Sequence, residues 1–240
     1  MKLFMPKQHG AWAMVTVPFW LGVIAGGFVW QDVPFFLGWV LLYLATYPML
    51  LLFKKKKTAF YIGWTTRYLI PAVLLLLFPL AENPAVVYFG LLMIPFFMIN
   101  AFYSSQNKDR AFMNDLSAIF AFSFASLASS FLSSRIVTGE SIFVFSASVL
   151  FFIGSTFYVK TMIREKKNPQ FKWLSWIYHL ILPLIWLAFG YWIAAIAVLP
   201  SLLRAVGFYG KPLSTKMVGI YEIANAALFF AVMAVQIIVN

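Results

Sequence analysis

The sequence contains no cysteine, which excludes disulfide bonds, thiolate metal sites and cysteine nucleophiles. Charge is also scarce, because Lys, Arg, Asp and Glu together make up only 10% of the 240 residues. Just seven of these residues are acidic. Hydrophobic residues account for 63% of the chain, so it cannot be a water-soluble domain.

Long apolar runs divide the chain into nine expected membrane-spanning helices. Gly190 splits the longest run, and Pro183 and Pro200 lie inside the two halves, where neighbouring helices can satisfy the freed backbone groups. The expected spans are 10–30, 34–53, 65–81, 85–103, 112–134, 141–162, 173–189, 191–208 and 218–239. We therefore predict an all-α polytopic helical bundle that forms one integral membrane domain over residues 1–240. The first span lacks a small-residue cleavage site after it, so we expect it to be retained.

The basic residues predict the orientation of these spans. Seventeen of the eighteen Lys and Arg residues fall before the first span, in every second gap or in the span ends beside that gap, and the group at the second gap is Lys54–Lys57 with Arg67. Arg135 alone lies on the other side. Because Lys and Arg near span ends favour the cytoplasm, we expect the N-terminus inside and Asn240 outside a bacterial inner membrane. Anionic lipid head groups account for the net charge of +11, so we expect no nucleic-acid partner.

Polar residues inside the spans gather toward the predicted cytoplasmic side. Ionisable groups within a bilayer are costly and often mark functional sites. The residues concerned are Asn100, Tyr103, Asn114, Asp115, Lys160, Arg164, His179, Arg204, Glu222 and Asn225, whereas the outer half has little beyond Gln236. This distribution predicts a polar cavity that opens to the cytoplasm and is closed outward by apolar side chains.

Each of these residues also has a purely structural interpretation. Groups near helix ends can extend to the interface, and Asp115 suits the first turn of a helix. Glu222 requires a partner, for which Arg204 and His179 are candidates, while His179 suits a hydrogen bond to a neighbouring helix. The serines of span 112–134 predict close packing between helices.

Two sequence patches resemble one known family. The first, PKQHGAWAM, places Lys7, Gln8 and His9 at the start of the first span, with Gly10 suited to close approach of another segment or a ligand. The second is RAFMND, residues 110–115. Both are similar to the YwiC-like bacterial membrane proteins, a resemblance that implies a bacterial inner-membrane location but no settled activity.

The loop from Tyr103 to Asn114 also resembles that of UbiA-type intramembrane prenyltransferases, which share nine helices and an inside N-terminus. That family binds a diphosphate through Mg²⁺ with two aspartate-rich motifs. The corresponding segments here, LLFKKKK at 51–57 and FYVKTMIREKKN at 157–168, contain no Asp. A hard cation needs clustered oxygen ligands, so we expect no metal, no cofactor and no Mg-dependent prenyl transfer. Lys160, Arg164, Lys166 and Lys167 are suited to an anionic head group instead.

The sequence therefore favours a membrane protein that binds, and in one version modifies, a lipid-like or isoprenoid-like molecule. A small-solute transporter and a non-catalytic accessory subunit of a respiratory or envelope complex stay open as alternatives, as do the oligomeric state and any catalysis. For proton transfer the candidates are His9, Asp115 and Glu222. The expected ligand-binding residues are Lys7, Gln8, Asn100, Tyr103, Lys108, Arg110, Asn114, Lys160, Arg164 and His179.

Overall fold

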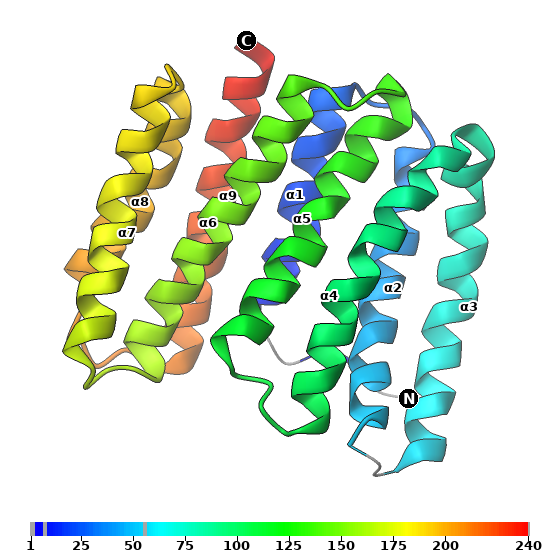
Figure 1. Cartoon of the computed structure of the whole chain (residues 1–240), viewed down its shortest axis with the longest axis horizontal. Helices are drawn as coiled ribbons and strands as arrows, with labels where there is room; N and C mark the ends of the chain where they lie inside the picture. Colours follow the sequence, from blue (N-terminus) through cyan, green and yellow to red (C-terminus); the bar gives the residue numbers. More distant parts are fainter. Residues whose placement is uncertain (1–2, 7–8, 55–56, 240) are drawn as a thin grey trace. The chain divides into compact units, whose positions relative to one another are not determined.

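The computed structural model describes residues 3–6, 9–54 and 57–239, and this part of the chain is helical without any strand. Figure 1 colours the helices by their position in the sequence, from blue at the N-terminus to red at the C-terminus. Their bounds are α1 His9–Gly26, α2 Asp32–Leu52, α3 Thr58–Glu82, η1 Pro84–Val86 (a short 3₁₀ helix), α4 Val87–Ser105, α5 Phe112–Ser134, α6 Gly139–Ile163, α7 Pro169–Ala188, α8 Trp192–Gly207 and α9 Thr215–Val239. The predicted all-α class with nine α-helices is confirmed for the described residues.

Seven of these helical segments are long and apolar enough to cross a membrane. The other two are shorter: α1 has 18 residues and α8 has 16. At 1.5 Å per residue they measure about 27 and 24 Å, close to the hydrocarbon thickness of a bilayer. The chain is therefore a multi-pass membrane protein.

The start of α3 differs from the prediction. The sequence predicted a span from residue 65, with Arg67 counted among the basic residues at its cytoplasmic end, whereas α3 already begins at Thr58. Lys57 has a left-handed backbone (φ 50°), and the chain turns directly from it into the helix. Arg67 thus lies roughly 14 Å inside α3. Its guanidinium lies over the Trp64 ring, 5.2 Å from the centroid, and its long side chain can extend toward the interface.

The fold divides into two compact units, which we describe separately. Unit 1 contains residues 18–145 with the described N-terminal residues, and it includes the whole of α2, α3, α4 and α5. Unit 2 contains residues 9–17 and 146–239, and it includes most of α6 and the whole of α7, α8 and α9. That the two units form one domain stays a prediction.

In unit 1, α1 and α5 pack closely through small residues. The Ser129 hydroxyl donates to the Phe19 carbonyl (2.8 Å), and the Ser133 hydroxyl donates to the Gly26 carbonyl (2.7 Å). A Cβ atom added at Gly22 would lie 2.2 Å from the Ser126 carbonyl oxygen, so glycine is required there. The predicted packing role of the α5 serines is confirmed.

In unit 2, aromatic rings fill much of the interior. Phe151 on α6 and Phe229 on α9 stack with centroids 3.9 Å apart. The hairpin of α7 and α8 is tied by the Trp176 indole N–H, which donates to the Ala205 carbonyl (3.0 Å). A second buried cluster joins Tyr158, Met162, Ala205 and Val218.

The end of unit 1 that we predicted to lie outside contains two buried polar residues at connections between helices. Asp32 is fully buried, and its Oδ2 accepts from the Val29 N–H (2.9 Å). Asn83 is buried too, and its amide donates to the Phe131 carbonyl (3.0 Å). Both residues lie in the predicted gaps between spans, where helix ends and connections have backbone groups that need polar partners. The expected apolar outer half of the spans stays a prediction.

Candidate functional site

A hydrogen-bonded network joins α4 and α5 at the end of unit 1 that carries the basic loops. The Asn100 amide lies 2.9 Å from both the Asn114 backbone oxygen and its Oδ1, and 2.7 Å from the Ser117 hydroxyl. The Asn114 amide in turn donates to the Asp109 carbonyl (2.9 Å). The structure thus brings Asn100 and Asn114 together, as the sequence predicted, but their amide groups bond within the protein.

The loop between α4 and α5 contains a second set of contacts. Lys54, at the end of α2, forms an ion pair with Asp109 (2.6 Å). Lys108 and Arg110 in the same loop are exposed, and Tyr103 is half-buried on the last turns of α4. Asp115 lies in the first turn of α5, as predicted, and is half-buried. This arrangement leaves basic side chains at the surface beside a well-bonded loop.

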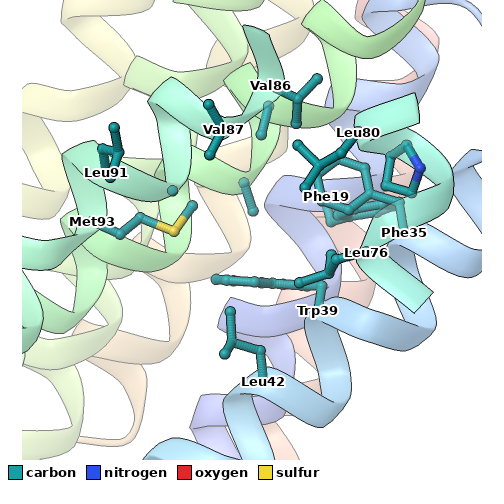
Figure 2. A pocket seen from close by; sticks show the side chains of 14 residues that line it. Phe19, Phe35, Trp39, Leu42, Leu76, Leu80, Val86, Val87, Leu91 and Met93 are labelled. Carbon is teal, nitrogen blue, oxygen red and sulfur yellow. The ribbon is translucent and has the colours of Figure 1, made fainter. Parts of the chain in front are cut away.

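Toward its other end, unit 1 contains an apolar cavity with a volume of about 180 Å³. Figure 2 shows the aromatic rings of Phe19, Phe35 and Trp39 on one side and Val87, Leu91 and Met93 on another. The remaining lining residues are Leu42, Leu76, Pro79, Leu80, Val86, Gly90, Ala125 and Ala128. Every lining side chain is apolar, except for the indole N–H of Trp39, so the cavity suits a hydrocarbon group.

This cavity is not the one that the sequence predicted. We expected a polar cavity lined by charged and amide side chains near the cytoplasm, but none of the predicted site residues lines the cavity in Figure 2. The sequence missed it because no local pattern distinguishes lining from packing. Trp39 and Phe35 resemble ordinary core residues of an apolar helix. The space that they line exists only because of the distances between the helices of unit 1, which the sequence does not give.

A buried ion pair lies in the interior of unit 2. Arg204 on α8 pairs with Glu222 on α9, and the two side chains are 6% and 9% exposed. Arg204 also donates to the Ser155 hydroxyl on α6 (3.3 Å) and to the Tyr221 carbonyl (3.4 Å). Its guanidinium carbon lies 4.1 Å from the centroid of the Tyr158 ring. Of the two partners that the sequence analysis considered for Glu222, Arg204 and His179, the structure pairs it with Arg204.

His179 lies beside this pair. Its Nδ1 is 2.7 Å from the Ser175 carbonyl of the same helix, so it donates there and leaves Nε2 as an acceptor. Nε2 is directed at α6, where a Cβ added at Gly154 would lie 3.2 Å from it. No described residue forms a hydrogen bond with Nε2, so the predicted bond from His179 to a neighbouring helix is not formed.

The basic residues of unit 2 are divided between the interior and the surface. Lys160 on α6 is buried, whereas Arg164, which follows α6, is exposed together with Lys166 and Lys167. A single anionic group held by Lys160 and Arg164 therefore stays a prediction. The sequence analysis did not select Tyr158, Ser155 or Ser201, because hydroxyl groups in an apolar helix are usual in packing. The informative signal was their spacing of two to five residues from Lys160 or Arg204 on the same helix.

Some predicted residues lie outside the described part of the chain. These are Lys7 and Gln8, and of His9 only the backbone at the start of α1 is described. A Cβ added at Gly10 would meet no described heavy atom within 4 Å, so no described segment makes the close approach that we expected there. Within the described ranges, no three His, Asp or Glu residues lie close enough together to hold a metal ion.

Comparisons with known proteins give the chain relatives along its whole length. The family described as YwiC-like protein matches residues 5–130. The chain is 43% identical to the uncharacterized protein YwiC of Bacillus subtilis (strain 168), over 99% of both chains. It is 40% identical to an uncharacterized protein of Haemophilus influenzae, over 98% of this chain and 99% of the relative. No solved structure matches the chain significantly.

Proposed function

We propose a function on one premise: the chain belongs to the YwiC-like family of proteins. It binds a long-chain amphipathic molecule, of lipid-like or isoprenoid-like chemistry, in a bacterial inner membrane with its N-terminus inside. The observation that carries the proposal is the apolar cavity of unit 1, because an apolar cavity of this kind favours hydrocarbon over water.

The volume of the cavity limits what enters it. About 180 Å³ is less than a pocket for a whole drug-sized ligand and more than the engineered 150 Å³ cavity that accepts one benzene ring. The lining offers almost no hydrogen-bonding group. The cavity therefore takes one segment of a chain, such as a few methylene or isoprene carbons, and the polar head of the ligand lies elsewhere.

The position of the head follows from the positions of charge in unit 1. Leu42 and Met93 line the cavity. Leu42 lies twelve residues before Lys54, which follows the end of α2, and Met93 lies twelve residues before Ser105, the last residue of α4. At 1.5 Å per residue this separation is roughly 18 Å. Lys108 and Arg110 are exposed near that end and suit an anionic head. A ligand that reaches both places needs a long chain, which favours a lipid-like molecule over a small solute.

The test compares two matched glycine variants by native mass spectrometry of protein purified from membranes. Gly90 on α4 lines the cavity, Gly63 on α3 does not, and a Cβ at either position meets no described atom within 4 Å. We expect the wild type and Gly63→Leu to carry a bound lipid-like mass and Gly90→Leu to lose it. A wild type without any such mass, or an unchanged mass in Gly90→Leu, contradicts the proposal.

A small-solute transporter is the second candidate. Transporters are commonly built from two repeats with the substrate site between them. An odd number of helices does not divide into equal halves. The boundary between the two units near Phe145 nevertheless leaves α2 to α5 before it and most of α6 with α7 to α9 after it. The same measurement discriminates between the two functions: a bound lipid-like mass that Gly90→Leu removes supports lipid binding, whereas a wild type without such a mass supports the transporter. An accessory subunit is supported by no feature of either unit.

A further inference from the structure

The buried ion pair of unit 2 belongs to a larger polar cluster that joins four helices. Ser155 and Tyr158 come from α6, His179 from α7, Arg204 from α8 and Glu222 from α9. The Asn225 amide, one turn beyond Glu222, donates to the Ser201 hydroxyl one turn before Arg204 (2.9 Å). These residues lie roughly 5–15 Å along their helices from the ends that carry the loops 164–168 and 208–214.

Several polar atoms of this cluster are buried without a partner among the described residues. They are the Tyr158 hydroxyl, His179 Nε2, Arg204 Nε and Asn225 Oδ1. All four side chains are more than nine-tenths buried. A buried polar atom that forms no hydrogen bond is costly, and such atoms in folded proteins usually have a partner. Four such atoms on the side chains of one polar cluster provide hydrogen-bonding capacity that a bound group can use.

The buried ion pair of Arg204 and Glu222 is a second argument for a bound ligand. A buried pair of opposite charges seldom stabilises a fold more than apolar side chains of similar size, because both charges lose their hydration. Stability therefore does not explain why Arg204 and Glu222 occupy the interior of unit 2. A requirement to orient a polar ligand does explain it, since the Glu222 carboxylate and the Tyr158 ring hold the guanidinium of Arg204 in place.

We propose that this cluster is a binding site for a small neutral group that both donates and accepts hydrogen bonds, namely a hydroxyl group. Arg204 Nε–H is a donor, His179 Nε2 and Asn225 Oδ1 are acceptors, and the Tyr158 hydroxyl is either. Arg204 and Glu222 neutralise each other, so the cluster does not favour a charged ligand. A water molecule has two hydrogens and two lone pairs and can bond all four atoms, whereas the hydroxyl of a membrane alcohol has one hydrogen and can bond at most three of them. The inference is independent of the function proposed for unit 1.

The test uses Tyr158→Phe, which removes only the hydroxyl and keeps a ring beneath Arg204. If the site binds a hydroxyl group, this substitution removes a hydrogen bond and lowers the Tm of the purified protein by about 2–4 °C. If the Tyr158 hydroxyl has no partner, its removal relieves a cost and leaves the Tm unchanged or raised. Tyr178→Phe is the matched control, because the Tyr178 hydroxyl donates to the Leu150 carbonyl (2.7 Å). It should lower the Tm in any case.

Two further measurements identify the source of the hydroxyl. A membrane alcohol appears in native mass spectra of the wild type and is lost from Tyr158→Phe. Bound water instead makes Tyr158 react with hydroxyl radicals faster than Tyr68, another buried tyrosine, whose hydroxyl donates to the Phe4 carbonyl. An unchanged or raised Tm for Tyr158→Phe overturns the proposal. So does a lowered Tm that comes with neither a lost mass nor selective labelling of Tyr158.

Discussion

Arg204 on α8 forms an ion pair with Glu222 on α9, where each side chain exposes less than a tenth of its surface. The pair joins the last two helices across a connection of seven residues. Because both charges are shielded from water, each depends on the other much more than surface charges do.

Removing one member of this pair should therefore be far more damaging than removing both. We expect Glu222→Gln to lower the free energy of unfolding by about 3–5 kcal/mol, because it leaves the Arg204 guanidinium buried without its counter-charge. The double variant Arg204→Met/Glu222→Met should lie much closer to the wild type. Unfolding in detergent, followed by tryptophan fluorescence, measures both. Equal losses in the single and double variants would show that the pairing is unimportant.

The ion pair between Lys54 and Asp109 provides the opposite case. These side chains are 21% and 42% exposed, and water screens their attraction. We expect Asp109→Asn to change the free energy of unfolding by no more than about 1 kcal/mol. A loss as large as that of Glu222→Gln would mean that burial does not control the strength of these pairs.

Close packing of α1 on α5 should make Gly22 intolerant of even one methyl group. A Cβ at this position would lie 2.2 Å from the Ser126 carbonyl oxygen, so Gly22→Ala must displace one helix. We expect a loss of about 1–3 kcal/mol in the same unfolding measurement. Gly63→Ala on α3 is the control, since its Cβ meets no described atom within 4 Å and alanine favours a helix. A stable Gly22→Ala would argue against this contact.

Asn100 should act mainly in stability. Its amide is directed at Asn114 and Ser117, so Asn100→Leu should lower the free energy of unfolding by about 1–2 kcal/mol. Its effect should be non-additive with that of Ser117→Ala in a double-mutant cycle, because the two side chains are in contact. If the protein keeps its stability but loses a bound lipid-like mass, Asn100 is a ligand-binding residue as the sequence analysis predicted.

The orientation can be tested with reporter fusions. We expect a reporter fused after Asn240 to lie outside the cytoplasm, and a reporter inserted at Gly210 between α8 and α9 to lie in the cytoplasm. A reporter that is active in only one compartment distinguishes the two locations. The short helix α8 makes this a demanding test. If α8 does not cross the membrane, both reporters change side: the one at Gly210 lies outside and the one after Asn240 lies in the cytoplasm. A reporter after Asn240 that is active in the cytoplasm would overturn the predicted orientation.

Much of the fold followed from local sequence. The bounds predicted for α5 coincide with the structure, because a serine-rich apolar run begins and ends in polar loops there. The start of α3 did not follow, since Arg67 interrupts the apolar pattern but not the helix. The site was harder to predict. Arg204 was one of two partners predicted for Glu222, because burying either charge alone is costly. No pattern in the sequence indicated the cavity beside Trp39.

The sequence by itself determined the class of this protein and the number of its helices. Apolar length and scarce charge are properties of each segment alone, and the bilayer acts on them directly. Only the tertiary structure decided which polar groups find partners. Asn100 bonds within the protein, while Tyr158 and His179 have buried polar atoms without a partner among the described residues. That difference depends on distances between helices, because a hydrogen bond requires its two atoms to lie within about 3 Å of each other.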